Sequence, residues 1–205
     1  MIVGVPKEIY PGERRVALVP LVIPALNKAG LDVVVETQAG LAAGFPDAGY
    51  IEKGAKMVAS REEVFATADI IAQFLVHGAN DKNGSLDLPL LRKGQVLIGF
   101  VRPMGTLGTL RDIAERGVTA FSVELMPRTT RAQSMDALSS MATICGYKAV
   151  ILAADTLPRI FPMLTTAAGT ISPARVLIIG AGVAGLQAIA TARRLGAAGS
   201  SLEGR

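Results

Sequence analysis

A glycine-rich turn carries the clearest chemistry in this sequence. Gly180, Gly182 and Gly185 have the spacing G-x-G-x-x-G. They follow an apolar run, Arg175–Ile179, and open a helical pattern, Val183–Leu195. In such a strand–turn–helix the first glycine permits the tight turn, the second lets the backbone approach a pyrophosphate, and the third lets the helix pack on the strand. The free N–H groups of the helix N-terminus then favour phosphate. The motif predicts a dinucleotide-binding turn, and a plain tight turn is the alternative.

A dinucleotide fold also needs an acidic residue about 20 positions further on, at the end of the next strand, to bind the adenosine ribose. Glu203 falls near that spacing, but residues 198–205 (AGSSLEGR) lack strand character. We therefore interpret the position of Glu203 as coincidence. We expect residues 198–205 to be a tail or the scar of a truncation, and the nucleotide fold to stop after its first strand and helix.

The composition excludes several classes of protein. Half of the 205 residues are hydrophobic and 19% are charged, which excludes intrinsic disorder. A single cysteine, Cys145, excludes an intramolecular disulfide and a cysteine zinc site, and we expect no metal centre. Cys145 lies among apolar residues of a helical pattern, so we expect a buried, inert thiol. The only histidine, His77, is expected in an exposed loop.

The patterns of charge and hydropathy limit the cellular location of the protein and the classes of partner that it could bind. The net charge is +4, but no basic run exceeds two residues, which argues against nucleic-acid binding. The sequence opens on a strand pattern instead of a secretory signal. No uninterrupted run of 18 apolar residues occurs, so we expect no direct insertion into a membrane. These observations predict a cytoplasmic protein.

Short apolar runs alternate with helical patterns through the first 125 or so positions of the chain. Such strands, apolar on both faces and separated by helices, predict a parallel sheet covered on both sides. The fold class is therefore α/β, with a doubly wound N-terminal subdomain. The expected strands are 2–5, 32–36, 56–58, 70–76, 95–101 and 119–123.

The organisation changes near Pro127. Residues 134–157 predict one long helix that is apolar nearly all round, so it is buried or lies between domains. We expect an N-terminal α/β subdomain at 1–127, and a loop, linking helix and connector at 128–173. The start of a Rossmann subdomain follows at 174–197, and the tail at 198–205.

Four stretches together resemble one family. Val5–Glu8 and Glu13–Leu18 are similar to the opening of the alanine dehydrogenase and pyridine nucleotide transhydrogenase superfamily. Pro127–Ser140 resembles the nucleotide-contacting loop of the transhydrogenase alpha subunit, and Phe161–Thr170 is similar to the same family. The resemblance covers residues 1 to about 197. It implies the N-terminal portion of an NAD(H)-binding component, present here as a truncated fragment that binds poorly.

The resemblance also implies a reaction and its partners. Hydride passes between NADH and NADP⁺, and NADP(H) is held by a partner subunit. Proton translocation is performed by membrane-spanning subunits, through which the chain associates peripherally with the inner membrane. A homodimer is implied. Direct transfer between two nicotinamides needs no side-chain acid or base, but it does need near-attack positioning.

The family's site residues carry over one by one. In the family the glutamine, here Gln133, orients the nicotinamide-ribose end, while the arginine and aspartate, here Arg128 and Asp136, fix the loop and the carboxamide; these three are implied as catalytic. The implied cofactor contacts in the loop are Arg128, Thr129, Thr130, Arg131, Gln133, Asp136 and Ser139. Those in the glycine turn are Gly180, Gly182, Val183 and Gly185. From the residues alone, an ion pair between Arg128 and Asp136 that only stabilises the helix start is the alternative.

Alanine dehydrogenase is the nearest competing function, and a non-catalytic α/β fragment is a third hypothesis. The resemblance implies that the dehydrogenase carries a lysine near residues 70–76 and a histidine after the strand that ends near 101. Gln73 and Leu75 occupy the first region and Arg102 the second. Amino-acid oxidation needs a proton acceptor near the substrate amine. The expected positions lack one, which favours transhydrogenase.

Overall fold

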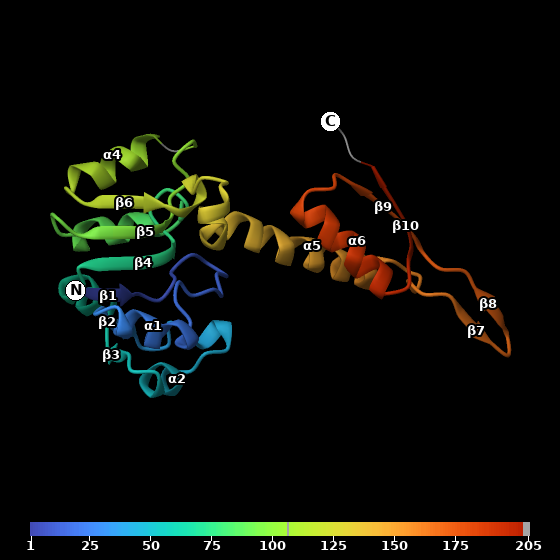
Figure 1. Cartoon of the computed structure of the whole chain (residues 1–205), viewed down its shortest axis with the longest axis horizontal. Coiled ribbons are helices and arrows are strands. Elements are labelled where there is room, and N and C mark those ends of the chain that lie inside the picture. The colour runs from blue at the N-terminus through green and yellow to red at the C-terminus, as the bar shows by residue number, and fades with distance from the viewer. Residues whose placement is uncertain (106, 203–205) are drawn as a thin grey trace. The chain divides into compact units, whose positions relative to one another are not determined.

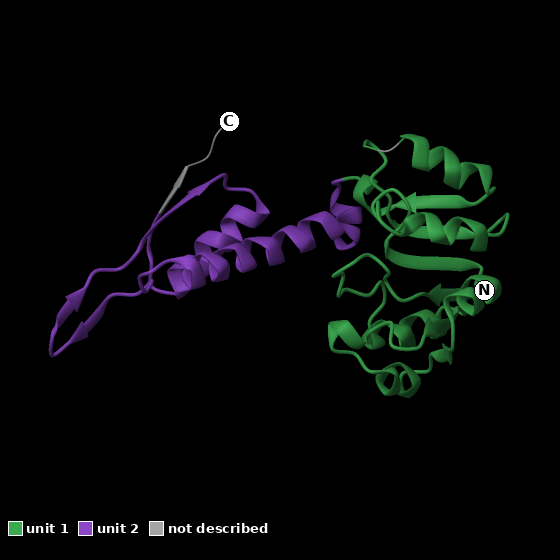
Figure 2. Cartoon of the chain, turned by 180° about the vertical axis from the view of Figure 1, so that it is seen from behind, with its two compact units in different colours: residues 1–127 green, residues 128–205 purple. Residues whose placement is uncertain are grey.

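The chain forms two compact units in the computed structural model, which describes residues 1–105 and 107–202. Unit 1 comprises Met1–Pro127 and unit 2 comprises Arg128–Arg205 (Figures 1 and 2). Among the described residues, two hydrophobic cores lie in unit 1 and one lies in unit 2.

Unit 1 contains a six-stranded sheet in which every neighbouring pair is parallel. The strands are β1 (Ile2–Val5), β2 (Asp32–Glu36), β3 (Lys56–Val58), β4 (Ile70–Leu75), β5 (Val96–Phe100) and β6 (Thr119–Ser122). The order β3-β2-β1-β4-β5-β6 reverses direction between β1 and β4. The predicted parallel α/β fold is confirmed.

Alternation along β2 explains why both faces of this sheet are covered. Val33 and Val35 lie in one core with Tyr50, and Val34 lies in the other with Phe65. Successive side chains of a strand point to opposite faces, so a run of three valines serves both cores. The covering helices are α1 (Ile23–Lys28), α2 (Asp47–Glu52), α3 (Arg61–Thr67) and α4 (Leu107–Glu115), with short 3₁₀ helices at Pro20–Val22, Leu41–Ala43, Gly84–Leu90 and Val123–Leu125.

Unit 2 is built on a long helix. Its elements are the 3₁₀ helix η5 (Thr130–Met135), α5 (Ala137–Thr156), β7 (Leu164–Thr166), β8 (Gly169–Ile171), β9 (Arg175–Ile179), α6 (Val183–Arg194) and β10 (Ala198–Leu202). The strands β7 and β8 form an antiparallel hairpin, and β9 and β10 form a parallel pair.

The helices α5 and α6 pack side by side (Figure 1), and their backbones approach closely at Gly146. A Cβ atom on Gly146 would overlap the carbonyl oxygen of Ala184. Beyond this point, Val150 of α5 shares a core with Ala188 and Ala192 of α6. Residues spaced by four lie on one face of a helix, so each helix presents a stripe of small side chains to the other.

The described residues include a second strand in unit 2, where the sequence predicted a tail. All five residues of β10 pair in parallel with β9, from Ala198 with Arg175 to Leu202 with Ile179. The expectation that this segment lacks strand character was wrong. Ladder pairing uses backbone N–H and C=O groups, and tertiary context overrides the weak strand propensity of glycine. Glu203 lies outside the described residues.

α5 is covered less completely than the sequence predicted. Gly146 and Val150 are its buried residues, whereas Cys145 is exposed, so the expectation of a buried thiol was wrong. Because the helix is apolar nearly all round, the sequence could not show which side α6 covers. In length and composition α5 could span a membrane, a criterion that core helices of soluble proteins also meet.

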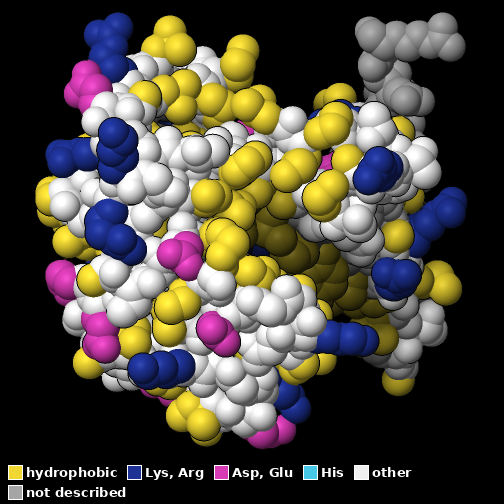
Figure 3. Space-filling view, turned by 60° about the vertical axis from the view of Figure 1, so that its left-hand side comes forward, with side chains coloured by type: hydrophobic (Ala, Val, Ile, Leu, Met, Phe, Trp, Pro, Cys, Tyr) yellow, Lys and Arg dark blue, Asp and Glu magenta, His cyan; other side chains and the backbone are white. Residues whose placement is uncertain are grey.

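The surface mixes charge types. On the face shown in Figure 3, Lys and Arg side chains are scattered among acidic and apolar ones. In unit 2, Leu177 and Ile179 of β9 are 58% and 80% exposed. One face of the β9–β10 pair therefore has little cover among the described residues.

The close approach of α5 and α6 predicts a large penalty for one added methyl group. Gly146→Ala should lower the free energy of unfolding by about 1–3 kcal/mol, because the new Cβ meets a backbone oxygen. Gly108→Ala in α4 is the matched control, since a Cβ there meets nothing within 4 Å. It should gain up to about 1 kcal/mol from helix propensity. Urea unfolding followed by circular dichroism measures both, and an equally stable Gly146→Ala chain would contradict the packing.

Candidate functional site

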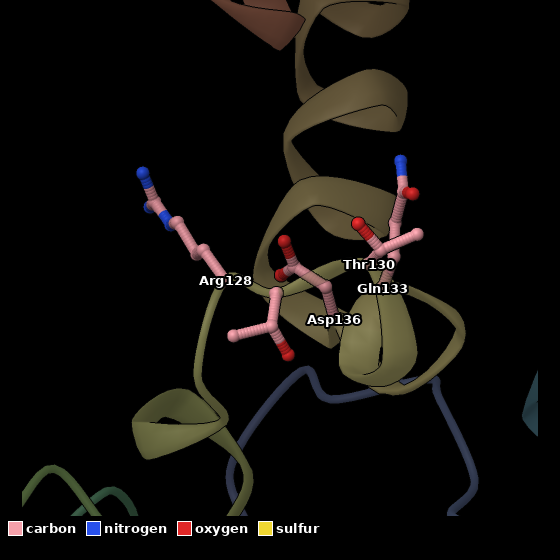
Figure 4. Close-up of a pocket in the computed structure, with 5 residues that line it drawn as sticks. Arg128, Thr130, Gln133 and Asp136 are labelled. Atoms are coloured by element: carbon pink, nitrogen blue, oxygen red, sulfur yellow. The ribbon is translucent and has the colours of Figure 1, made fainter.

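A pocket opens beside the N-terminus of α5 (Figure 4). Its volume is about 290 Å³, and it is lined by Arg128, Thr129, Thr130, Gln133 and Asp136. In this view the Asp136 carboxylate lies between the Arg128 and Gln133 side chains. The pocket therefore offers a cation, a hydroxyl, an amide and a carboxylate.

The 3₁₀ helix η5 explains why these side chains meet. With three residues per turn, side chains three positions apart lie above one another. Thr130 and Gln133 have that spacing within η5. Asp136 comes three residues after Gln133, directly after the last residue of η5. Ala132, between Thr130 and Gln133 in the sequence, is buried.

Asp136 caps α5 and is held by Ser139. Its Oδ1 accepts the Ser139 backbone N–H at 2.9 Å, and its Oδ2 accepts the Ser139 hydroxyl at 2.6 Å. The Ser139 hydroxyl lowers the pKa of Asp136 most, followed by the Ser139 N–H, and the Arg128 charge adds to the effect. Asp136 is therefore a carboxylate at neutral pH, and it can accept hydrogen bonds but cannot donate a proton.

Two loop residues from the sequence prediction lie outside the pocket lining. Ser139 uses its hydroxyl and its N–H to hold Asp136. Arg131 is exposed and is absent from the lining residues. The remaining five predicted loop residues are the ones that the structure brings together.

The glycine turn has the conformation that its motif requires. Gly180 has a φ of +97°, in the left-handed region. A Cβ on Gly185 would overlap the Gly180 carbonyl oxygen, so only glycine fits there. A Cβ on Gly182 would meet nothing within 4 Å, which leaves open space in front of α6.

The start of α6 suits an anion. Its first turn carries no acidic residue, and no side chain caps its N-terminus within the described part of the chain. The first N–H groups of a helix lack intrahelical partners, and together with the dipole they attract negative charge. Val183 is the first residue of this turn.

The loop and the glycine turn are two separate places along the same helix. The glycine turn contacts α5 at Gly146, ten residues after Asp136. At 1.5 Å per residue this corresponds to about 15 Å along the helix axis. The pocket of Figure 4 is lined by the loop alone. A ligand that uses both places must be extended.

The carboxyl ends of β4 and β5 in unit 1 hold different chemistry. Gln73 is buried, and its amide nitrogen donates to Asp87 at 2.8 Å. Arg102 follows β5 with a φ of +59°. The expectation of an exposed His77 was wrong, since its ring is largely buried and its Nε2 lies 3.0 Å from Asp112. No local pattern signals this pair, because the two residues are 35 positions apart.

Comparisons with known proteins identify the family. Residues 4–145 match the alanine dehydrogenase/PNT N-terminal domain, and residues 149–205 match the C-terminal domain of the same family. The NAD(P) transhydrogenase subunit alpha of Cereibacter sphaeroides is 45% identical over 197 residues, which is 96% of this chain and 36% of that protein. An NAD(P) transhydrogenase alpha-subunit protein of Rhodospirillum rubrum is 42% identical over 197 residues, covering 96% and 51%. The chain thus spans about half or less of the length of these relatives.

Two solved structures share the fold. The transhydrogenase from Sinorhizobium meliloti superposes with a TM-score of 0.91 at 44% identity, covering 98% of this chain and 58% of that one. An L-alanine dehydrogenase superposes with a TM-score of 0.82 at 30% identity, covering 96% and 53%.

Two glycines of the turn should respond differently to substitution, because Gly185 is tightly packed and Gly182 faces open space. Gly185→Ala should lower the free energy of unfolding by about 1–3 kcal/mol, since the Cβ would overlap the Gly180 oxygen. Gly182→Ala places its Cβ in open space at a φ of −71° and should cost under about 1 kcal/mol, the difference between glycine and alanine at an N-cap. Urea unfolding of both variants tests this. Equal losses would show that the turn is not packed as described.

Proposed function

The chain belongs to the alanine dehydrogenase/pyridine nucleotide transhydrogenase family, and we propose that it supplies the NAD(H)-contacting parts of a transhydrogenase alpha subunit. The reaction proposed is hydride transfer between NADH and NADP⁺, with NADP(H) on a partner subunit and proton translocation in membrane-spanning subunits. The observation that carries the proposal is the pocket of Figure 4, which brings together Thr130 and Gln133 of η5 and Asp136 at the start of α5.

The two places along α5 suit the two ends of a dinucleotide. The pyrophosphate is proposed to bind at the N-terminus of α6, where Gly182 leaves room and N–H groups are free of side-chain caps. The nicotinamide end is proposed to bind in the loop pocket. A dinucleotide is an extended ligand, so it can reach from one place to the other. Bound NADH supplies the hydride.

The loop residues have distinct proposed roles. The Gln133 amide both donates and accepts, which suits a carboxamide or a ribose hydroxyl. Arg128 adds a cation at the opposite side of the pocket in Figure 4. Asp136, held by Ser139, accepts hydrogen bonds from the ligand and fixes the start of α5. None of these roles transfers a proton, in keeping with a direct hydride transfer. Arg131 and Ser139 do not line the pocket, so their proposed role is to hold the loop in its conformation and not to contact the nucleotide.

The chemistry in unit 1 disfavours alanine dehydrogenation. That reaction needs a group that accepts a proton near the substrate amine. The Gln73 amide already donates to Asp87, and Arg102 is a permanent cation. Neither residue can act as the base. The remaining alternative is that the chain is a non-catalytic fragment. Titration with NADH would distinguish this alternative from the proposed function.

The proposed assembly is a homodimer bound peripherally, from the cytoplasmic side, to membrane-spanning subunits. The exposure of the β7–β8 hairpin supports the proposal that a second copy of the chain binds there. All six of its strand residues are exposed, and a two-stranded hairpin is marginally stable on its own. Such a hairpin is stabilised when a partner surface covers it. Sedimentation velocity of the whole subunit, with Ile171→Asp as the disrupting variant, measures this association.

Nucleotide binding by these 205 residues is expected to be weak. Leu177 and Ile179 of β9 are largely exposed, so the strand that precedes the glycine turn lacks cover on one face, and we expect this to weaken binding. We expect a dissociation constant no tighter than about 1 mM for NADH, roughly −4 kcal/mol. Saturation-transfer NMR detects binding in this range.

Two variants complete the binding test. Gly182→Ala should abolish saturation transfer to NADH because its Cβ occupies the pyrophosphate space, while Gly108→Ala in unit 1 should leave the signal unchanged. A dissociation constant below about 0.1 mM, roughly −5.5 kcal/mol, would contradict the weak-binding expectation. An unchanged signal in Gly182→Ala would contradict the proposed pyrophosphate site.

Gln133 should affect the rate of transfer more than affinity. In the whole subunit assembled with its NADP(H)-binding partner, Gln133→Ala should slow hydride transfer by on the order of 100-fold, the cost of a misplacement of about 1 Å. The NADH dissociation constant should change little, since the pyrophosphate is held at α6. Stopped-flow transfer to an NADP⁺ analogue, with NADH titrated in parallel, separates the two effects.

The conservative variant and a remote one serve as controls. Gln133→Asn keeps the amide but shortens its reach, so it should fall between the wild type and Gln133→Ala. Glu115→Gln, on the exposed end of α4, should leave rate and affinity unchanged. An unchanged transfer rate in Gln133→Ala at saturating NADH would remove Gln133 from the site.

A further inference from the structure

A single carboxylate holds the segment Val123–Pro127, here called the entry segment, through which the chain passes from β6 to the loop 128–136. The Glu124 Oε1 accepts the Val101 N–H at 3.0 Å and the Arg102 N–H at 2.5 Å. The Glu124 Oε2 accepts the Ser122 hydroxyl at 2.5 Å. Two consecutive backbone amides and one hydroxyl therefore converge on one side chain of the entry segment.

The turn after β5 explains why the two amides point to one place. Arg102 has a φ of +59°, in the left-handed region that few residues other than glycine adopt. A left-handed residue in a turn lets successive N–H groups line a concavity that binds an anion. Pro103 follows and has no N–H to add. The anion bound in this concavity is the Glu124 carboxylate.

Among the residues that the structure describes, little else bonds the entry segment to unit 1. The pairing of β6 with β5 ends at Ser122. The described backbone bond of the entry segment, from the Met126 N–H to the Val123 oxygen, lies within the segment itself. Val123 and Met126 are half-buried and Leu125 is 60% exposed, so the apolar packing of the segment is partial. The described hydrogen bonds that join it to the rest of unit 1 are therefore those of Glu124.

The loop 128–136 thus has a carboxylate on each side of it. Glu124 precedes Arg128 by four residues, and Asp136 closes the loop by accepting the N–H and the hydroxyl of Ser139. The Arg128 side chain is exposed, and in the described part of the chain it makes no hydrogen bond or ion pair. Its place in the pocket therefore depends on the backbone on either side of it.

We propose that Glu124 is a positioning residue for this loop: by holding the entry segment, it sets the point from which Arg128 extends toward the nucleotide. Glu124 is not among the residues that line the pocket, so it acts through Arg128. The inference rests on the proposed function of the pocket.

The length of the side chain, and not its charge, should decide the effect of substitutions at Glu124. A glutamine keeps a carbonyl oxygen at the same reach for the two N–H groups, and the Ser122 hydroxyl can rotate to accept from the amide nitrogen. An aspartate keeps the charge but is one methylene shorter. Glu124→Gln should therefore behave like the unmodified chain, whereas Glu124→Asp should behave like Glu124→Ala.

Amide hydrogen exchange of the 205-residue chain, followed residue by residue by NMR, tests the fastening without any nucleotide. In Glu124→Ala, and in the milder Glu124→Asp, exchange should quicken by about tenfold or more at the Val101 and Arg102 amides, which lose a charged acceptor. It should also quicken at the Met126 and Ala132 amides, whose bonds lie in the entry segment and in the loop. Glu124→Gln should leave all four amides nearly unchanged. Exchange that quickens at Val101 and Arg102 alone would overturn the proposal.

Transfer kinetics of the whole subunit, assembled with its NADP(H)-binding partner, test the consequence for the reaction. Glu124→Ala should slow hydride transfer by about 10- to 100-fold, the cost of a displacement of up to about 1 Å, and leave the NADH dissociation constant nearly unchanged. In an Arg128→Ala background it should add little, because both changes remove the same placement. Glu115→Gln, on the exposed end of α4, is the remote control.

The outcomes separate this inference from the proposed function. Three results would overturn the positioning role alone: losses that multiply in the double variant, a slow Glu124→Gln, or an unchanged rate in Glu124→Ala beside a slow Gln133→Ala. An unchanged rate in Gln133→Ala would instead contradict the proposed function. Amide exchange would then still decide whether Glu124 holds the entry segment and the loop.

Discussion

The contact between Gly146 and the Ala184 carbonyl oxygen is the constraint on which unit 2 depends. With no side chain between them, α5 and α6 approach until the backbone of one helix touches the other. This contact fixes the start of α6, and with it the glycine turn, at a set distance from the N-terminus of α5. The loop pocket lies at that N-terminus. The two proposed binding places, which share no residues, are therefore held at a constant spacing by one glycine.

Within that frame, two kinds of short-range geometry present the chemistry. The 3₁₀ helix η5 places side chains three positions apart above one another, as at Thr130 and Gln133. The glycine turn presents backbone amides and open space rather than side chains. A side-chain amide such as that of Gln133 and an uncapped helix N-terminus are groups that could hold a ligand without titrating near neutral pH. Chemistry that needs positioning but no proton transfer is well served by such groups.

Local features could be predicted from the sequence, and features that depend on distant residues could not. The glycine turn and the valines of β2 could be predicted because their roles depend on residues only a few positions away in the sequence. β10 was not predicted because its glycine and serines have weak strand propensity, and they form a strand only by pairing with β9. Cys145 was misplaced because an all-round apolar helix does not reveal which side its partner covers. The ring of His77 is buried by a contact with Asp112 that no local pattern encodes.

The carboxyl groups of Glu8 and Asp136 show how burial decides between roles that the sequence cannot separate. Each accepts two hydrogen bonds from the protein, and each lies near an arginine charge. Near the surface, the bonds from Ser139 dominate and the pKa of Asp136 falls. At the half-buried Glu8, the loss of hydration outweighs two amide bonds and raises the pKa to about 7. The same acceptor geometry thus makes Asp136 a fixed charge that holds a helix start. At Glu8 two accepted hydrogen bonds do not keep the pKa low, because desolvation opposes them.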